Sequence, residues 1–134
     1  MPHLVVLYTG NLGPQAHMSA LCRKLADVMV SAADERGTRV FPTGGVRVLA
    51  YPAAEFAVAD GKRDYAFVYL NLRMAQGRGE DVRSKVGQTL LGCAKEHFEK
   101  LLTQRLLGIT LQIDEGAEVF GAKVGNIHPL FPAG

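Results

Sequence analysis

The sequence predicts an α+β fold: a duplicated β-α-β arrangement with a four-stranded sheet and two helices on one face. Three observations support this prediction. Two apolar, β-rich runs, at residues 3–8 and 65–72, begin about sixty residues apart. A long amphipathic pattern follows each run, and a shorter β-rich run follows each amphipathic pattern. The chain of 134 residues also has the length of one compact domain.

The first half of the chain begins with a strand. Residues 3–8 are apolar at nearly every position, as in a central strand covered on both faces, and a glycine-rich turn ends them. Pro14 suits the first turn of a helix, because its fixed φ and missing N–H cost least there. From Pro14 to about Asp34, apolar residues recur at helical spacing: Leu21, Leu25, Val28, Met29 and Ala32. Residues 46–51 are then expected to form a second strand, closed by Pro52.

The second half repeats the order of elements. Residues 65–72 are predicted as a strand that is apolar on both faces, and residues 80–106 as one long helix. Residues 107–113 alternate apolar and polar, as in a strand covered on one face. The remaining tail is rich in glycine and proline and is expected to form at most a short edge strand near 122–125.

These elements define one domain, residues 1–134, with two halves that share a pattern but few identical residues. The halves span about 2–52 and 63–114, and a C-terminal tail spans 115–134. Two long helices are enough to cover only one face of the sheet. Because the first and third strands are apolar on both sides, we expect neighbouring subunits to cover the second face, giving a homo-oligomer with sheets packed inward.

Composition excludes several classes of protein. The 15 Lys and Arg residues against 13 Asp and Glu give a net charge of +2, too small to indicate a nucleic-acid partner or an acidic membrane. No run approaches the length of a membrane span, and the N-terminus lacks the basic region of a signal peptide. Cys22 and Cys93 form neither a disulfide framework nor a metal cluster and are expected to be buried thiols. We therefore expect a cytoplasmic protein.

Pro2 is the first candidate for a catalytic residue. Removal of Met1 would leave the Pro2 nitrogen as a secondary amine, which acts as a general base when it is unprotonated. Apolar surroundings and a nearby cation both lower the pKa of an amine from its ordinary chain-terminal value of about 7.7–8.0. The alternative is that Met1 and Pro2 merely begin the chain, in which case the Pro2 nitrogen is an amide and has no catalytic role.

Two arginines are candidates for binding an anion. Arg47 lies between two valines in a predicted strand, where a charged side chain must face a cleft, an interface or water. Its planar fork suits a carboxylate or a developing enolate oxygen, although an exposed position or a structural ion pair is an equal alternative. Arg78 lies between two glycines ahead of a helix, a setting typical of anion-binding loops and also of solvated loop arginines. Three further arginines are expected to be surface charges: Arg63, Arg73 and Arg83.

No cofactor or metal site is predicted. The four histidines lack metal-ligand spacing and are expected on the surface or hydrogen-bonded in the core: His3, His17, His97 and His128. Residues 10–13 follow a strand and precede a helix with two glycines, but they lack the third glycine of a dinucleotide fingerprint.

Several segments together resemble the 5-carboxymethyl-2-hydroxymuconate isomerase family of the tautomerase superfamily. The resemblance covers nearly the whole chain in the right order. It is carried by Met1-Pro2-His3, Phe41-Pro-Thr-Gly-Gly-Val-Arg47, Ala59-Asp-Gly-Lys-Arg-Asp-Tyr-Ala-Phe-Val68, Gly77-Arg78 and Asn126-Ile-His-Pro-Leu-Phe131. It implies the duplicated β-α-β fold, a homotrimer with sites near subunit boundaries, and a role in breaking down homoprotocatechuate, which is formed from 4-hydroxyphenylacetate.

The resemblance also assigns roles to particular residues. The family's amino-terminal proline, the general base, falls on Pro2; two family arginines that bind substrate carboxylates or the dienolate fall on Arg47 and Arg78. Family members carry a further arginine two residues after Arg47, where this chain has Leu49. The leading hypothesis is therefore a cofactor-free isomerase acting on an unsaturated carboxylic acid. The alternatives are a non-catalytic oligomeric module that binds small carboxylic acids, and a keto-enol tautomerase of drifted specificity.

Overall fold

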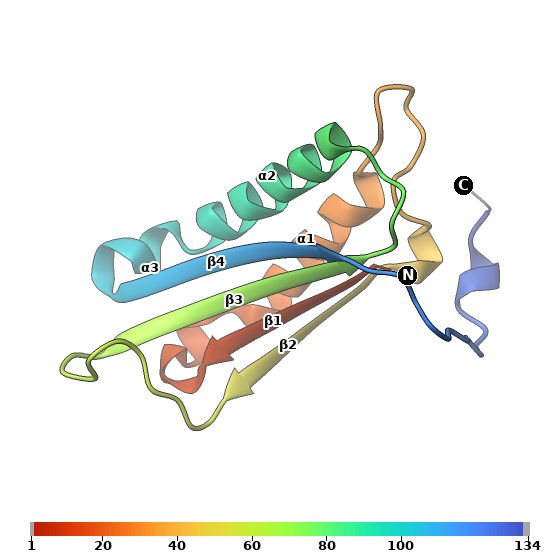
Figure 1. Ribbon diagram of the computed structural model, residues 1–134. Helices are drawn as coiled ribbons and strands as arrows, with labels where there is room; N and C mark the ends of the chain where they lie inside the picture. The colour runs from red at the N-terminus through yellow and green to blue at the C-terminus, as the bar shows by residue number, and fades with distance from the viewer. Residues whose placement is uncertain (1, 133–134) are drawn as a thin grey trace.

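The computed structural model describes residues 2–132 and contains one four-stranded sheet with helices packed against it (Figure 1). The strands are β1 (His3–Thr9), β2 (Arg47–Ala53), β3 (Tyr65–Met74) and β4 (Leu106–Glu115). The α-helices are α1 (Met18–Ser31), α2 (Glu80–His97) and α3 (Glu99–Gln104). Short 3-10 turns occupy Gly10–Leu12, Pro14–Ala16, Thr43–Gly45 and His128–Leu130.

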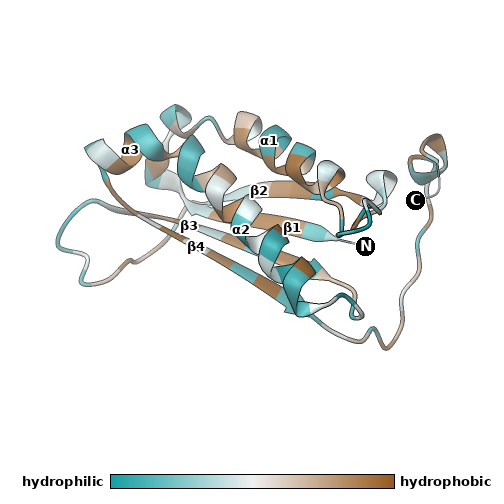
Figure 2. Ribbon diagram, turned by 90° about the horizontal axis from the view of Figure 1, so that it is seen from above, coloured by the Kyte–Doolittle hydropathy of each residue, from teal (hydrophilic) through white to brown (hydrophobic). Residues whose placement is uncertain are grey.

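The sheet has the strand order β2-β1-β3-β4. β1 is parallel to β2 and β3 is parallel to β4, whereas the central strands β1 and β3 are antiparallel. Each parallel pair is joined by helix, α1 in the first half and α2 with α3 in the second, and these helices lie on the same side of the sheet (Figures 1 and 2). This arrangement confirms the predicted α+β fold with a duplicated β-α-β pattern.

The core lies between the sheet and the helices. On β1, Leu4 and Val6 point into it and are completely buried. The residues of β3 in the same layer are also completely buried: Val68, Leu70 and Leu72. The helices contribute Leu21, Leu25, Met29 and Leu90, none of which retains any exposed surface. The period-2 pattern of the strands and the 3.6-residue pattern of the helices thus meet in one apolar layer.

The opposite face of the sheet carries large apolar side chains that nothing within residues 2–132 covers, and we refer to it as the open face. Leu7 of β1 is 44% exposed, and Leu49 and Tyr51 of β2 are 47% and 49% exposed. Residues 3–8 were expected to be covered on both faces. Within residues 2–132 only the helical side of the sheet is covered, so any cover for the open face must come from another molecule.

Both helices begin or end differently from the prediction. Pro14 opens a 3-10 turn, and His17, in a left-handed conformation with φ 48° and ψ 55°, separates that turn from α1. The predicted helix over 80–106 is two helices, because Phe98 takes a non-helical conformation (φ −96°, ψ 8°). Leu106 already belongs to β4. Phe98 is completely buried, so tertiary packing overrides a residue pattern that runs on without a break.

The strands are longer than predicted, and the tail as far as residue 132 contains no strand. β2 continues through Pro52, which is compatible with an edge strand because β2 pairs with β1 alone. β3 extends to Met74. Residues 122–125, expected as a possible edge strand, form no regular structure, and the tail up to residue 132 stands away from the sheet beside the N-terminal end of β1 (Figure 1).

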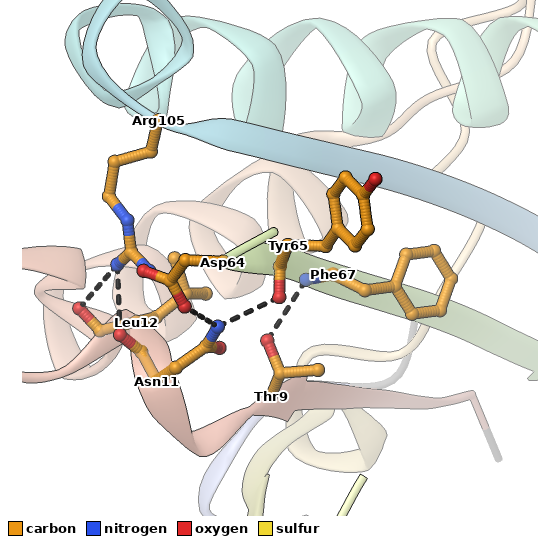
Figure 3. A network of polar contacts seen from close by, with 7 residues as sticks. All are labelled: Thr9, Asn11, Leu12, Asp64, Tyr65, Phe67 and Arg105. Carbon is orange, nitrogen blue, oxygen red and sulfur yellow. Dashed lines mark hydrogen bonds and ion pairs between the residues drawn. The ribbon is translucent and has the colours of Figure 1, made fainter. Parts of the chain in front are cut away.

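A polar network fixes the other end of the sheet, where β1 finishes and β3 and β4 begin (Figure 3). Arg105 Nη1 donates to the carbonyl oxygens of Asn11 (2.9 Å) and Leu12 (3.3 Å), and Nη2 donates to the Asp64 carboxylate (3.2 Å). Asn11 Nδ2 donates to Asp64 Oδ1 (2.9 Å) and to the Tyr65 carbonyl oxygen (2.8 Å). The network joins the turn after β1 to the starts of β3 and β4.

We expect the stability of the protein to depend on pH through His97. His97 Nε2 lies 2.8 Å from the Ala16 carbonyl oxygen and Nδ1 lies 3.2 Å from Lys24 Nζ, so the imidazole is neutral with Nε2 donating. Burial lowers the pKa of His97 below its ordinary value of 6.5, and the charges of Lys24 and His17 lower it further. The unfolded chain therefore binds a proton that the folded chain excludes, and the free energy of unfolding falls as the pH drops below about 6.5.

The measurement is urea unfolding between about pH 7.5 and pH 5 at one protein concentration, for the wild type and His97→Gln. The variant keeps a donor for the Ala16 carbonyl oxygen and cannot titrate, so its stability is expected to change less over this range. An equal change in both proteins would assign the pH dependence to other groups.

Candidate active site

Pro2 is buried at the N-terminal end of β1, in the middle of the sheet. The next residue, His3, pairs with Arg47 of β2 on one side and with Arg73 of β3 on the other. Continuing both registers by one residue places Pro2 between Val46 and Met74. Met1 lies outside the described residues, so its removal stays a prediction.

Arg47 begins β2 beside this end of β1. The side chain is half-buried, and its Nη1 donates to the carbonyl oxygens of Gly44 (2.7 Å) and Val46 (2.9 Å). Gly44 is required here, because a Cβ would stand 2.7 Å from His128 Cα. The close packing of 43–45 against the tail and the two hydrogen bonds hold the guanidinium in one position at the end of the sheet.

A cavity of about 1000 Å³ opens at this end of the sheet. Its walls are His3 and Arg47 from the sheet, Ala75 after β3, and the tail between Glu118 and Pro129. A second hollow, of about 670 Å³, lies between α1, β2 and the tail, and Arg47 lines it as well. Of the two predicted anion-binding arginines, Arg47 is therefore the one that lines a cavity, and it pairs with His3, the residue that follows Pro2.

Arg78 lies in the connection between β3 and α2 and is held by the protein itself. Its Nη2 donates to the Val40 carbonyl oxygen (2.7 Å), and its guanidinium lies 5.5 Å from the centre of the buried Phe41 ring. It lines neither cavity that Arg47 lines. Within one chain, Arg78 therefore has a structural contact that neither sequence interpretation included, and its role in substrate binding stays a prediction.

The cavity includes cationic or titratable residues that sequence reasoning did not assign to a site: His3, Lys123 and His128. His3 stands in register between Arg47 and Arg73, on the open face of the sheet. The alternation of side chains along each strand can be predicted from the sequence. The row formed by His3, Arg47 and Arg73 cannot be predicted in this way, because it depends on which strands are neighbours and in which register they pair.

The other sequence candidates lie away from this cavity or lack suitable partners. Cys22 and Cys93 are half-buried rather than fully buried, and burial raises the pKa of both thiols, which disfavours the reactive thiolate. Among residues 2–132, no group of three or more His, Cys, Asp or Glu side chains is arranged to hold a metal ion. No helix in the described part of the chain is long and apolar enough to cross a membrane.

Solved structures of low sequence identity share this fold. A fused 4-OT symmetric trimer shares it, with a TM-score of 0.60, 20% sequence identity, and coverage of 95% of this chain and 96% of the other. A member of the cis-3-chloroacrylic acid dehalogenase family, at 14% identity and a TM-score of 0.64, has the same fold over 97% of this chain and 83% of the other. These two comparisons show the fold and nothing beyond it.

Closer similarities define the family. The family model of 5-carboxymethyl-2-hydroxymuconate isomerase matches residues 2–131. A crystal structure of a 5-carboxymethyl-2-hydroxymuconate delta-isomerase is 52% identical, with a TM-score of 0.94 and coverage of 100% of this chain and 95% of that one. An isomerase structure from Deinococcus radiodurans R1 is 35% identical, with a TM-score of 0.85 and coverage of 96% and 92%. The Escherichia coli 5-carboxymethyl-2-hydroxymuconate Delta-isomerase is 30% identical over 131 residues, 98% of this chain and 99% of that protein.

The chain belongs to the 5-carboxymethyl-2-hydroxymuconate isomerase family and is an enzyme of the delta-isomerase type. The resemblance drawn from its sequence segments is thereby confirmed.

Proposed function

We propose that the protein is a cofactor-independent isomerase that shifts a double bond in 5-carboxymethyl-2-hydroxymuconate or a similar unsaturated 2-oxo or 2-hydroxy acid. The observation that carries the proposal is that the buried Pro2 lies beside Arg47 in the strand register, and that Arg47 lines a large cavity. The 52% identical delta-isomerase, which covers the whole of this chain, supports the choice of substrate. A place in the degradation of homoprotocatechuate and 4-hydroxyphenylacetate is part of the same proposal.

In the proposed mechanism Pro2 moves one proton. With Met1 removed, the neutral Pro2 nitrogen takes the acidic proton, from the 2-hydroxyl group of the enol or from a carbon next to the carbonyl. The resulting dienolate carries negative charge on its oxygen, which the Arg47 guanidinium stabilises. The Pro2 ammonium then returns the proton to another carbon, which moves the double bond and restores the base. Burial and neighbouring cations favour the neutral amine that this cycle requires.

An ultraviolet assay tests the function directly. The purified protein is mixed with 5-carboxymethyl-2-hydroxymuconate, and the loss of the conjugated dienol absorbance is followed over time; phenylpyruvate enol is run beside it. We expect faster turnover of the first compound. Turnover of phenylpyruvate enol alone would favour the keto-enol tautomerase, to which the apolar Leu49 on the open face would be suited. Binding of the acids without turnover of either would favour the non-catalytic module.

We also propose that the protein is a homotrimer in which the open face of each sheet is covered by neighbouring subunits. The exposed apolar side chains of Leu7, Leu49 and Tyr51 support this proposal, as does the trimeric state of a protein with the same fold.

Replacing Leu7 with lysine is expected to reduce the mass in solution from that of a trimer to that of a monomer. A lysine at the centre of an apolar interface would leave an uncompensated buried charge. Light scattering coupled to size exclusion measures the mass. Leu102→Lys is the matched control, because Leu102 is 40% exposed on α3 and lies outside the sheet. A Leu7→Lys protein that keeps the wild-type mass would show that the open face is not the interface.

A further inference from the structure

We propose that Arg73 binds a substrate carboxylate that Arg47 does not reach and thereby selects acids that carry a third carboxylate. This inference rests on the proposed function, since it names a part of the substrate and the residue that recognises it. The sequence alone gave Arg73 no role beyond a surface charge.

The strand register places Arg73 at the same end of the sheet as Pro2 and Arg47. His3 pairs with Arg47 across β1 and β2 and with Arg73 across β1 and β3, so the three residues form one row across the sheet. Neighbouring strands are about 4.8 Å apart, so the Cα atoms of the two arginines are separated by about 10 Å. Two long side chains on either side of β1 can therefore contact different groups of one small molecule.

The row lies on the open face. Residues adjacent in the chain, Leu4 and Leu72, point into the helical core and are completely buried, so His3 and Arg73 point the other way. Towards the middle of the sheet, the open face is apolar along β1 and β2. Val5 and Leu7 are the next residues of β1 on this face after His3. The charged row thus borders the apolar surface, and two of its members, His3 and Arg47, line the cavity.

The Arg73 side chain extends beyond the sheet towards the tail that walls the cavity. Its Nη2 lies so close to Gly116 that a Cβ on this glycine would stand 2.8 Å away. Gly116 follows β4 directly and precedes Glu118, the first tail residue on the cavity wall. The exposed guanidinium is therefore near the part of the chain that leads from the sheet to the cavity.

Arg73 is also available to bind an anion. Within residues 2–132 its guanidinium makes no hydrogen bond or ion pair. The carboxylate nearest in register, Asp114, accepts a hydrogen bond of 2.8 Å from Asn71 Nδ2. By contrast, Arg47 and Arg78 both donate to backbone carbonyl oxygens, and Arg83 is paired with Glu115. An exposed arginine without a protein partner presents its whole fork to a carboxylate.

The chemistry of the proposed substrate suits such a cation. 5-Carboxymethyl-2-hydroxymuconate carries a carboxylate at each end of its chain and a third on the carboxymethyl branch. Leu49, two residues after Arg47 on the open face, supplies no charge. Arg73 supplies one from the opposite side of β1. An acid that lacks the branch leaves this arginine without its partner, and the loss of a charged hydrogen bond is the basis of discrimination.

The test compares 5-carboxymethyl-2-hydroxymuconate with 2-hydroxymuconate, the same chain without the branch. For Arg73→Gln, we expect KM for the branched acid to rise about tenfold or more, as for the loss of a charged hydrogen bond, with kcat nearly unchanged. KM for the unbranched acid should stay at the wild-type value. Arg73→Lys should recover part of the loss, because it keeps the charge without the fork. Arg63→Gln, exposed in the loop before β3, is the matched control and should behave as wild type.

Three outcomes would overturn the inference: an unchanged KM for both acids, an equal rise for both, or a fall in the mass of the oligomer caused by Arg73→Gln. The last would assign Arg73 to a subunit contact. A wild-type protein that turns over neither acid would refute the proposed function separately. In that case calorimetric binding of the branched acid by the wild type and by Arg73→Gln decides the role of Arg73, with equal affinities counting against it.

Discussion

Replacing Pro2 with alanine is expected to lower kcat for the proposed isomerisation about 100-fold or more, the range typical of losing a positioned general base. The secondary amine would be lost, and a smaller residue would leave the base less firmly held between Val46 and Met74. Circular dichroism and the mass in solution should match the wild type, because Pro2 adds no side-chain hydrogen bond to the sheet. The ultraviolet assay gives kcat, and a pH profile of kcat/KM reports which group must be neutral.

Two further proteins make the test specific. Pro52→Ala removes a proline from the edge strand β2 at a site exposed to solvent, and it should keep wild-type activity. Inserting a lysine between Met1 and Pro2 keeps the proline but blocks removal of the preceding residues, which turns its nitrogen into an amide. That protein should be inactive. Full activity in the insertion protein would exclude Pro2 as the base, whatever the result for Pro2→Ala. Intact mass of each protein establishes where its chain begins.

The fold could be predicted from the sequence because its strands and helices follow simple periods. The alternation of 107–113 and the helical stripe from Leu21 to Met29 each correspond to one face of an observed element. What could not be predicted depends on contacts distant in the chain. The break at Phe98 lies within a continuous apolar stripe, and β2 continues through Pro52 because no strand pairs with its outer edge.

The candidate site was partly predictable for a related reason. Pro2 and Arg47 stood out locally, one as a potential secondary amine and the other as a charge inside a strand. Their proximity follows from the pairing of His3 with Arg47, which no local pattern encodes. Arg78 shows the converse. Its flanking glycines suggested an anion site, whereas its guanidinium is occupied by the Val40 carbonyl oxygen and the Phe41 ring. Local sequence cannot distinguish a substrate carboxylate from the chain's own carbonyl group as the partner of an arginine.

Replacing Arg47 with methionine is expected to lower kcat about 100- to 1000-fold, as for the removal of one group that stabilises a developing oxyanion. Arg47→Lys should recover only part of the loss, since an ammonium keeps the charge but not the planar fork. KM should also rise if the same guanidinium binds a carboxylate of the ground state. Steady-state kinetics in the ultraviolet assay separate these contributions.

Arg47 also donates to the carbonyl oxygens of Gly44 and Val46, so a loss of activity could arise from a disturbed strand end rather than from lost charge stabilisation. Arg105 provides the matched control, because it makes the same kind of contact, to the carbonyl oxygens of Asn11 and Leu12, at the opposite end of the sheet. Arg105→Met should lower the free energy of unfolding by about 2 kcal/mol and leave kcat near the wild-type value. If both variants lose stability and kcat in the same proportion, Arg47 acts through the fold alone. A loss of kcat confined to Arg47→Met requires the guanidinium to act on the reacting molecule.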